Sequence, residues 1–286
     1  MTQSHSPSTR WTFWAMLAVL LLASYLRIHD LNAQGLWGDE GWSIWLARGD
    51  SLRDLTLTMV ADHHGPIYST LLRAWDGIAG QSVLALRWIT VLFSVGSVAL
   101  IYGLGRAMFT PAAGVGAALA FALMDKQIVL AQEVRDYPMV FFSMIAIAYF
   151  YVRWLGQNQG AASSAPTKAL RRRGIRVKPA SPPTPSPSEM ERGSQPGHSP
   201  TKASETTPPF SAQRGNGAGG IGVNAPGYAF WFVACSVWGL YLHYYCFMVN
   251  LAILLHALIT LRDRQAWRHF LALNGLIALA FAPWLP

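Results

Sequence analysis

The sequence predicts an all-α membrane protein: a polytopic transmembrane helical bundle of about seven spans, with short interfacial helices in its first outside loop. Two observations carry this prediction. Charged residues make up only 13% of the chain, about half the usual share. The apolar residues, 52% of the total, gather in uncharged runs that are long enough to cross a bilayer as helices. A water-soluble globule is therefore excluded, and so is a disulfide scaffold, because both cysteines lie in one apolar stretch.

Seven apolar runs are expected to span the bilayer. The first, 11–26, has the composition of either a cleaved signal peptide or an uncleaved anchor, and the runs that follow it favour the anchor. The stretch 227–261 carries no formal charge and suits two helices that break near 243–245. The other expected spans are 88–105, 107–124, 137–155 and 270–286.

The distribution of charge predicts the orientation of the bundle. With a cytoplasmic N-terminus, the inside segments hold 15 of the 22 Lys and Arg residues, and the outside segments hold 10 of the 14 acidic residues. Basic residues favour the cytoplasmic side. We therefore expect a multi-pass protein of the cell (inner) membrane whose active face is extracytoplasmic.

We divide the chain into three parts. Residues 1–155 form an N-terminal module with four spans, whose first outside loop is 28–83, and residues 227–286 contribute three further spans. The insertion 156–226 is rich in Pro, Ser and Gly, so it is predicted to be a disordered cytoplasmic loop. Its basic cluster suits either contact with anionic lipid or a solvated linker. Most of the net charge of +8 lies in this insertion, and nucleic acid is therefore not a predicted partner.

The expected spans contain almost no ionisable side chains. Pumps and proton-coupled transporters need titratable groups at membrane depth, and here only His256 and His243 are candidates, since Arg153 lies near the end of its run. The charges cluster instead in the outside loops. This pattern favours an enzyme whose site lies at the membrane–water interface over a conduction path.

The first outside loop opens with two adjacent carboxylates, Asp39 and Glu40, flanked by glycines. Trp42, Trp45 and Leu46 follow at helical spacing, which predicts a helix lying in the membrane surface. Asp39 suits the N-cap of this helix. Because two carboxylates at the bilayer edge are unusual for a cap, we favour a catalytic role for Asp39, and Glu40 is balanced between function and a helix-dipole role.

Two more surface helices are predicted in this loop. Residues 51–54 have the pattern of a capping box, and Pro66 suits the first turn of a third helix. His63 and His64 lie just before that helix, where its positive end favours an anion. Together with Asp62 they also suggest a metal site, but adjacent residues are poorly spaced to bind one ion. No metal or other cofactor is therefore predicted.

The second outside loop contains one arginine, Arg135. A guanidinium offers paired donors and stays charged, which makes it a natural partner for phosphate. The alternative is a salt bridge to Glu133 or Asp136. The third outside corner, 243–245, carries polar-tipped aromatic residues that suit either a binding site or a membrane-interface belt.

The motifs in these loops occur in a characteristic order. They are Trp-Gly-Asp-Glu at 37–40, His-Gly-Pro-Ile-Tyr at 64–68, Arg87, Gly-Arg at 105–106 with Phe109, Gln-Glu-Val-Arg-Asp-Tyr at 132–137, Leu-His-Tyr-Tyr at 242–245 and Pro-Trp-Leu-Pro at 283–286. Over 11–155 and 227–286 the chain resembles the GT-C glycosyltransferases of the dolichyl-phosphate-mannose–protein mannosyltransferase type, including bacterial relatives that modify lipid A or cell-wall glycans.

The resemblance implies an inverting glycosyltransferase that moves a sugar from a polyprenyl-phosphate carrier to an acceptor hydroxyl outside the cytoplasm. Asp39 is then the general base, with Glu40 as a second catalytic carboxylate. In-line displacement places Asp39 and Arg135 on opposite sides of the sugar. The residues expected to bind the donor phosphate are Arg135, His63, His64, His243 and Tyr244. Those expected to bind substrate are Tyr68, Glu133 and Tyr137.

The chain departs from this family in two respects. Members normally have more spans and often a soluble outer domain, so we expect a fragment, a truncated product or half of a functional unit. The insertion is not a family feature. The alternative functions are a transporter or flippase of lipid-linked glycans and a non-catalytic assembly subunit. The expected partners are a polyprenyl-phosphate-linked sugar, the lipid bilayer, and a glycan, lipid or protein acceptor.

Overall fold

A computed structural model describes residues 7–61, 65–172 and 227–284. Within these ranges every regular element is a helix, so the all-α prediction is confirmed. The chain divides into one unit of residues 1–160 with 226–286 and a second unit of residues 161–225. Residues 173–226, which are the greater part of the predicted insertion, lie outside the described residues.

Among the described residues, three helices are long and apolar enough to cross a membrane: α1 (Pro7–Ile28), α5 (Val83–Met108) and the first part of α8 (Tyr137–Arg172). A fourth candidate is the pair α6 (Pro111–Leu123) and α7 (Asp125–Ala131), which bends by 62° at its break. The chain is thus a membrane protein. Of the seven predicted spans, three are supported, or four if the bent pair forms one span.

The predicted break at 243–245 is confirmed. Helix α10 (Gly227–Leu242) ends just before it and α11 (Cys246–Thr260) begins just after it. These helices have 16 and 15 residues. At a rise of about 1.5 Å per residue they fall short of a hydrocarbon core about 30 Å thick. The prediction that each crosses the bilayer is therefore not confirmed.

The predicted limits of the last span were wrong. Helix α12 (Arg264–Phe281) begins before residue 270 because the Asp263 carboxylate accepts the backbone N–H of Ala266 at 2.8 Å and caps its first turn. It ends at Phe281 and continues into a short 3₁₀ turn, Ala282–Trp284. Charged side chains in its first turns interrupt the apolar run that a span requires.

Helix α8 continues through Arg172, into the segment whose composition predicts disorder. Several alanines occur in 157–172, and alanine has the highest helix propensity of all residues. The predicted onset of disorder at 156 therefore differs from the structure.

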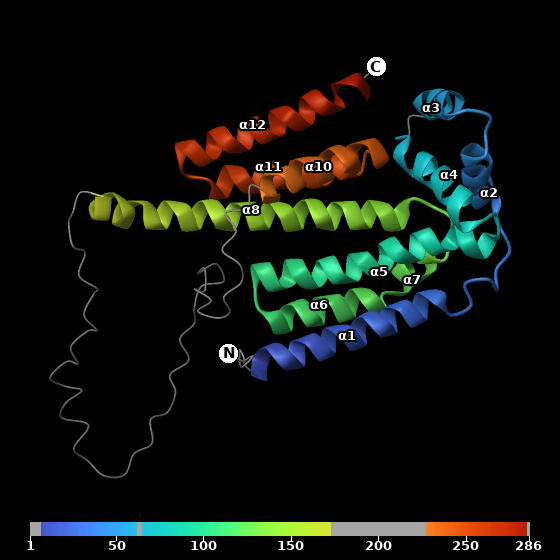
Figure 1. Cartoon of the computed structure of the whole chain (residues 1–286), viewed down its shortest axis with the longest axis horizontal. Helices are drawn as coiled ribbons and strands as arrows, with labels where there is room; N and C mark the ends of the chain where they lie inside the picture. The colour runs from blue at the N-terminus through green and yellow to red at the C-terminus, as the bar shows by residue number, and fades with distance from the viewer. Residues whose placement is uncertain (1–6, 62–64, 173–226, 285–286) are drawn as a thin grey trace, which may run out of the picture. The chain divides into compact units, whose positions relative to one another are not determined.

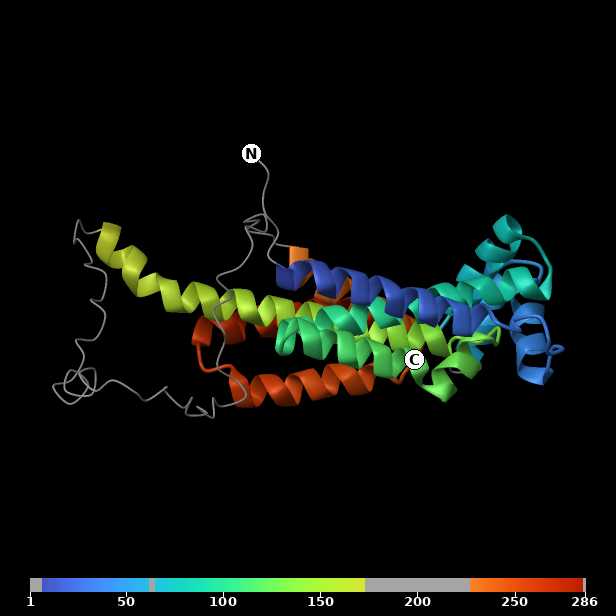
Figure 2. The ribbon, with the colours of Figure 1, turned by 90° about the horizontal axis from the view of Figure 1, so that it is seen from below.

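Three short helices make up most of the first outside loop, as predicted: α2 (Gly38–Ala47), α3 (Leu52–Ala61) and α4 (Ile67–Ala79). Figures 1 and 2 both place them at one end of the bundle. The indole rings of Trp42 and Trp45 stack with centroids 4.9 Å apart and are largely exposed. This suits an interfacial position, where an aromatic ring is partly apolar and partly wet.

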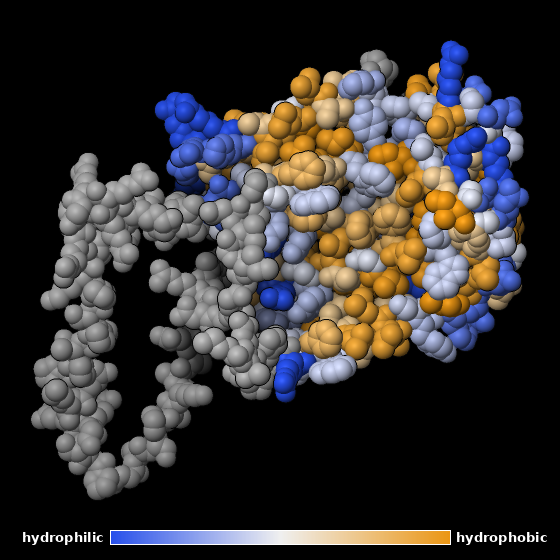
Figure 3. Space-filling model, in the orientation of Figure 1, coloured by the Kyte–Doolittle hydropathy of each residue, from blue (hydrophilic) through white to orange (hydrophobic). Residues whose placement is uncertain are grey.

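The predicted outside loops lie together at this end. The Gln132 side chain donates to the carbonyl of His29 at 2.8 Å, and the His243 ring lies 4.0 Å from the Asp136 carboxylate. On the face shown in Figure 3, apolar side chains cover the middle of the bundle and hydrophilic ones gather toward its two ends.

A buried arginine supports the bend between α6 and α7. Arg27, at the end of α1, has no exposed surface. It donates to the hydroxyl of Ser94 at 2.7 Å and to the carbonyl of Ala122 at 3.1 Å. The last carbonyls of a helix lack partners within the helix, so this guanidinium supplies one where the chain turns.

Candidate active site

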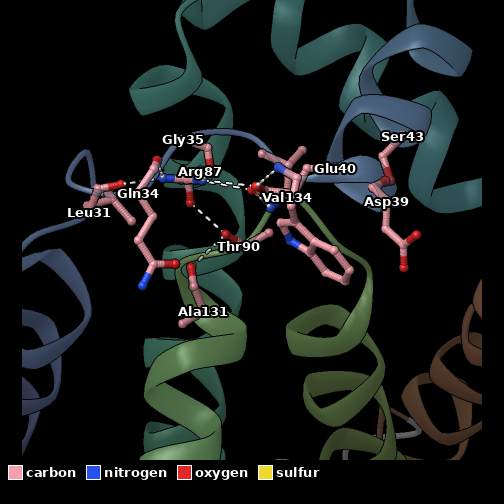
Figure 4. A network of polar contacts seen from close by, with 11 residues as sticks. Leu31, Gln34, Gly35, Asp39, Glu40, Ser43, Arg87, Thr90, Ala131 and Val134 are labelled. Atoms are coloured by element: carbon pink, nitrogen blue, oxygen red, sulfur yellow. Dashed lines mark hydrogen bonds and ion pairs between the residues drawn. The ribbon is translucent and has the colours of Figure 1, made fainter.

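The base of the candidate site is a buried ion pair between α2 and α5. Arg87 and Glu40 are both almost fully buried, and Arg87 Nη2 lies 2.9 Å from Glu40 Oε2 while Nε lies 3.1 Å from Oε1. Figure 4 shows the guanidinium aimed at the carboxylate. Such fork-shaped pairing is the strongest arrangement that these two groups form.

Further hydrogen bonds extend this pair into the loops. Glu40 also accepts the backbone N–H of Val134 at 2.8 Å. Arg87 also donates to the carbonyls of Leu31 and Gln34, each at 2.9 Å. The pair therefore fixes the first loop, the second loop and α5 to one another.

The expected N-cap role of Asp39 was wrong. Trp37 is the N-cap of α2, and it is Glu40 that reaches back to the Trp37 backbone N–H, at 3.4 Å. The Asp39 side chain is 53% exposed and points away from the Glu40–Arg87 network in Figure 4. The two adjacent carboxylates thus have opposite surroundings: that of Glu40 is buried and paired, and that of Asp39 is accessible.

A cavity of about 310 Å³ opens where the three loops meet. Six predicted site residues line it: Asp39, Tyr68, Arg135, Tyr137, His243 and Tyr244. They come from α2, α4, the turn before α8, α8 itself and the corner between α10 and α11. The fold therefore brings together residues that are more than 200 positions apart in the sequence.

Arg135 is held much less tightly than Arg87. Its Nη1 lies 3.5 Å from Asp39 Oδ2 and 3.4 Å from the Asp39 carbonyl. Its Nη2 lies 3.5 Å from the hydroxyl of Tyr137. Its buried Nε has no hydrogen-bond partner among the described residues. This guanidinium therefore keeps donor capacity for an anion.

The charge of Arg135 is secure. Burial on its own would lower the pKa of the guanidinium, but the hydrogen bond with Tyr137 and the charges of Asp39 and Asp136 outweigh it and raise the pKa. Arg135 is thus a permanent cation in the cavity.

Two expectations about Arg135 differ from the structure. Its guanidinium forms an ion pair with Asp39, whereas the alternative partners considered from the sequence were Glu133 and Asp136. The direct contact also means that a sugar ring cannot lie between Asp39 and Arg135 in this arrangement. The two side chains have to separate before a sugar can be bound between them.

Two predicted residues do not line the cavity. Glu40 is held in the buried ion pair, and Glu133 is not among the residues that line the cavity, although its carbonyl accepts the Arg135 backbone N–H at 2.8 Å. Burial raises the pKa of the Glu133 carboxyl, and the nearby charge of Glu40 adds to this rise. The predicted residues His63 and His64 lie outside the described part of the chain.

The structure adds cavity residues that were not assigned from the sequence. They include Asp136, Tyr245, Trp42 and Ser69. Asp136 was considered only as a salt-bridge partner, although it follows Arg135 directly and precedes α8. Within 7–61, 65–172 and 227–284, no group of three or more His, Cys, Asp or Glu side chains is placed to bind a metal ion.

Comparison with known proteins identifies one family. No curated protein and no solved structure gives a significant match to this chain. One family model does match, over residues 63–162. This segment contains Tyr68, Arg87, Arg135 and Asp136, and the match indicates a membrane glycosyltransferase. Over this segment the chain matches the family of dolichyl-phosphate-mannose-protein mannosyltransferases, which confirms the resemblance predicted from its motifs.

Proposed function

We propose that the chain is an inverting glycosyltransferase that moves a mannose-like sugar, or another hexose or pentose, from a polyprenyl-phosphate carrier to an acceptor hydroxyl. The observation that carries this proposal is that an accessible carboxylate, Asp39, and a loosely held guanidinium, Arg135, face one another in the same cavity. The acceptor is a glycan, a lipid or a protein.

Asp39 acts as the general base. It accepts the proton of the acceptor hydroxyl while that oxygen forms a bond to the anomeric carbon. The bond between the anomeric carbon and the phosphate oxygen breaks, and its electron pair leaves with the phosphate. Base assistance of this kind contributes about 10²–10⁴-fold to the rate. Asp39 suits the role because its side chain is exposed to the cavity.

Arg135 stabilises the departing phosphate. A phosphate needs no acid in order to leave, but its growing negative charge needs fixed donors. Among the described residues, the polar contacts of the Arg135 guanidinium are 3.4 to 3.5 Å long, so exchanging them for phosphate oxygens costs little. Moving toward phosphate would also release Asp39 for the acceptor.

Glu40 has a positioning role in this scheme rather than a catalytic one. Both of its oxygens are engaged by Arg87, and its side chain has no exposed surface. A carboxylate held in this way cannot reach an acceptor hydroxyl. Its neighbours in the chain and in space, Asp39 and Arg135, perform the chemistry.

The reaction is proposed to take place on the extracytoplasmic side of the inner membrane. The C-terminal end of α5, whose last turn holds Arg106, and the turn between α11 and α12, which holds Arg262, lie at the end of the bundle opposite α2, α3 and α4. The positive-inside rule favours the cytoplasm for that end. The N-terminus of α1 lies at that same end.

The decisive experiment measures sugar transfer and translocation in the same liposomes, with a radiolabelled polyprenyl-phosphate sugar as donor. Asp39→Asn should abolish transfer while it leaves expression and carrier binding largely intact. Asp125→Asn, an exposed carboxylate of α7 away from the cavity, is the matched control and should retain transfer. Persistent transfer by Asp39→Asn would refute the base assignment. Movement of the carrier across the bilayer without any transfer would favour a flippase.

A further inference from the structure

A second polar group lines the same cavity, apart from Asp39 and Arg135. It consists of Asp136, His243 and Tyr68, which come from the turn before α8, the α10–α11 corner and α4. The His243 Nε2 atom lies 4.0 Å from Asp136 Oδ2. The side chains of Asp136 and His243 are only 15% and 7% exposed. The group is therefore a built feature of the cavity wall rather than a set of surface side chains.

A hydrogen bond from a neighbouring residue determines which ring nitrogen of His243 carries the proton in the neutral form. The backbone N–H of Tyr245 donates to His243 Nδ1 at 3.2 Å. A ring nitrogen that accepts a hydrogen bond carries no proton, so the neutral ring has its proton on Nε2. That N–H faces Asp136 and the cavity. The wall thus presents a donor at His243 beside an acceptor at Asp136.

Tyr68 adds a buried hydroxyl to this group. Tyr68 is only 7% exposed. Its hydroxyl oxygen has no hydrogen-bond partner among the described residues. Burial and the charge of Asp136 raise the pKa of Tyr68, so the hydroxyl keeps its proton. Leaving a buried hydroxyl unpaired is costly, which is consistent with a partner that binds in the cavity.

This combination does not suit a phosphate. A carboxylate repels an anion, and the Asp136 carboxylate lies beside the His243 ring and acts electrostatically on Tyr68. A sugar hydroxyl both donates and accepts, so it matches a wall that offers acceptor and donor atoms together. The neighbouring rings of Tyr244 and Tyr245, whose centroids lie 4.3 and 4.6 Å from that of His243, add flat apolar surface for the carbon face of a sugar ring.

We propose that Asp136, His243 and Tyr68 bind hydroxyl groups of the sugar being transferred and determine which sugar is accepted. This inference rests on the proposed function and assigns His243 to the sugar rather than to the phosphate. The division of the cavity follows from charge: the guanidinium of Arg135 faces the phosphate, and the wall around Asp136 faces the neutral glycosyl unit.

The test uses a panel of polyprenyl-phosphate donors in which each sugar hydroxyl in turn is replaced by hydrogen. Wild-type protein should discriminate against at least one of these donors by about 10- to 100-fold in kcat/KM, the range for a lost hydrogen bond to a charged group. Asp136→Asn and Tyr68→Phe should reduce that ratio severalfold or more for the same hydroxyl. Tyr25→Phe, an exposed tyrosine of α1, should preserve it.

Two outcomes would overturn the inference. One is that Asp136→Asn and Tyr68→Phe lower kcat/KM by the same factor for every donor, as a merely structural role would. The other is that Tyr68→Phe weakens the binding of sugar-free polyprenyl phosphate as much as it weakens the binding of the sugar-bearing donor. Neither outcome affects the role of Asp39, whose test is total transfer of the intact donor. The two proposals therefore fail separately.

Discussion

Val134 donates its backbone N–H to the carboxylate of Glu40 across 2.8 Å, and these two residues are the chain neighbours of Arg135 and Asp39. One buried carboxylate therefore sets the distance between the two groups that we assign to chemistry. Arg87 completes the arrangement by holding that carboxylate from α5. The relative positions of Asp39 and Arg135 are thus determined by their chain neighbours, Glu40 and Val134.

This arrangement predicts a large loss of stability when one member of the pair is removed. Arg87→Ala leaves the Glu40 carboxylate buried without its cationic partner, which is expected to cost about 3–5 kcal/mol. The matched control is Arg48→Ala, because its ion pair with Asp76 is more exposed and is expected to contribute about 0–1 kcal/mol. Thermal unfolding of the detergent-purified variants measures the difference. Equal losses in the two variants would contradict the structural role of Arg87.

Arg135 is predicted to act on the donor rather than on the fold. Arg135→Ala should lower kcat/KM for the donor by about 10²-fold or more and leave the unfolding temperature nearly unchanged, because the contacts that it loses are long. Arg135→Lys keeps the charge without the fork and should be intermediate. Transfer rates measured against donor concentration, with Arg48→Lys as control, check this. An unchanged response to donor concentration would refute it.

Glu133 gives a prediction about pH. Because the fold raises the pKa of its carboxyl, the folded state favours the protonated form, and this contribution to stability is lost as pH rises through the folded-state pKa. Glu133→Gln removes the ionisable group. The variant should match wild type below about pH 4 and be slightly more stable at pH 7, by about 1–2 °C, because Glu133 is only partly buried. Unfolding scans at both pH values test the sign, and a variant that is less stable at pH 7 would contradict it.

Much of the fold is readable from local sequence. Ser51 and Thr110 cap their helices as short-range rules require, each accepting a backbone N–H three residues on, at 3.1 Å. The break at 243–245 was readable because a run of 35 residues is too long for one span. The number of spans was harder to predict, because hydropathy marks apolar runs and gives no direct measure of helix length.

The sequence predicts many of the residues that form the candidate site, but it does not predict the surroundings and the role of each one. Asp39 and Glu40 are adjacent and chemically alike, and their roles differ because Glu40 meets Arg87, which lies 47 positions away. Asp136 was undervalued because its neighbour in the site, His243, comes from the far end of the chain. Contacts of this range depend on how helices pack, and no local pattern encodes them.

Gly65 is predicted to be essential for the shape of the cavity. A side chain added there would collide with the carbonyl of Tyr241 at the end of α10, so only glycine lets α4 approach so closely. Gly65→Ala should push α4 away from α10 and separate Tyr68 from His243. A displacement of about 1 Å costs about 10²-fold in rate.

The matched control for Gly65→Ala is Gly77→Ala in α4, the helix that Gly65 precedes. A side chain at residue 77 would meet nothing within 4 Å, and alanine stabilises a helix interior by about 0.5–1 kcal/mol relative to glycine. Gly77→Ala should therefore be at least as stable as wild type and keep its transfer activity, whereas Gly65→Ala should lose both. Because the two changes add the same methyl group to one segment, equal transfer rates in the two variants would show that the close contact between α4 and α10 does not shape the site.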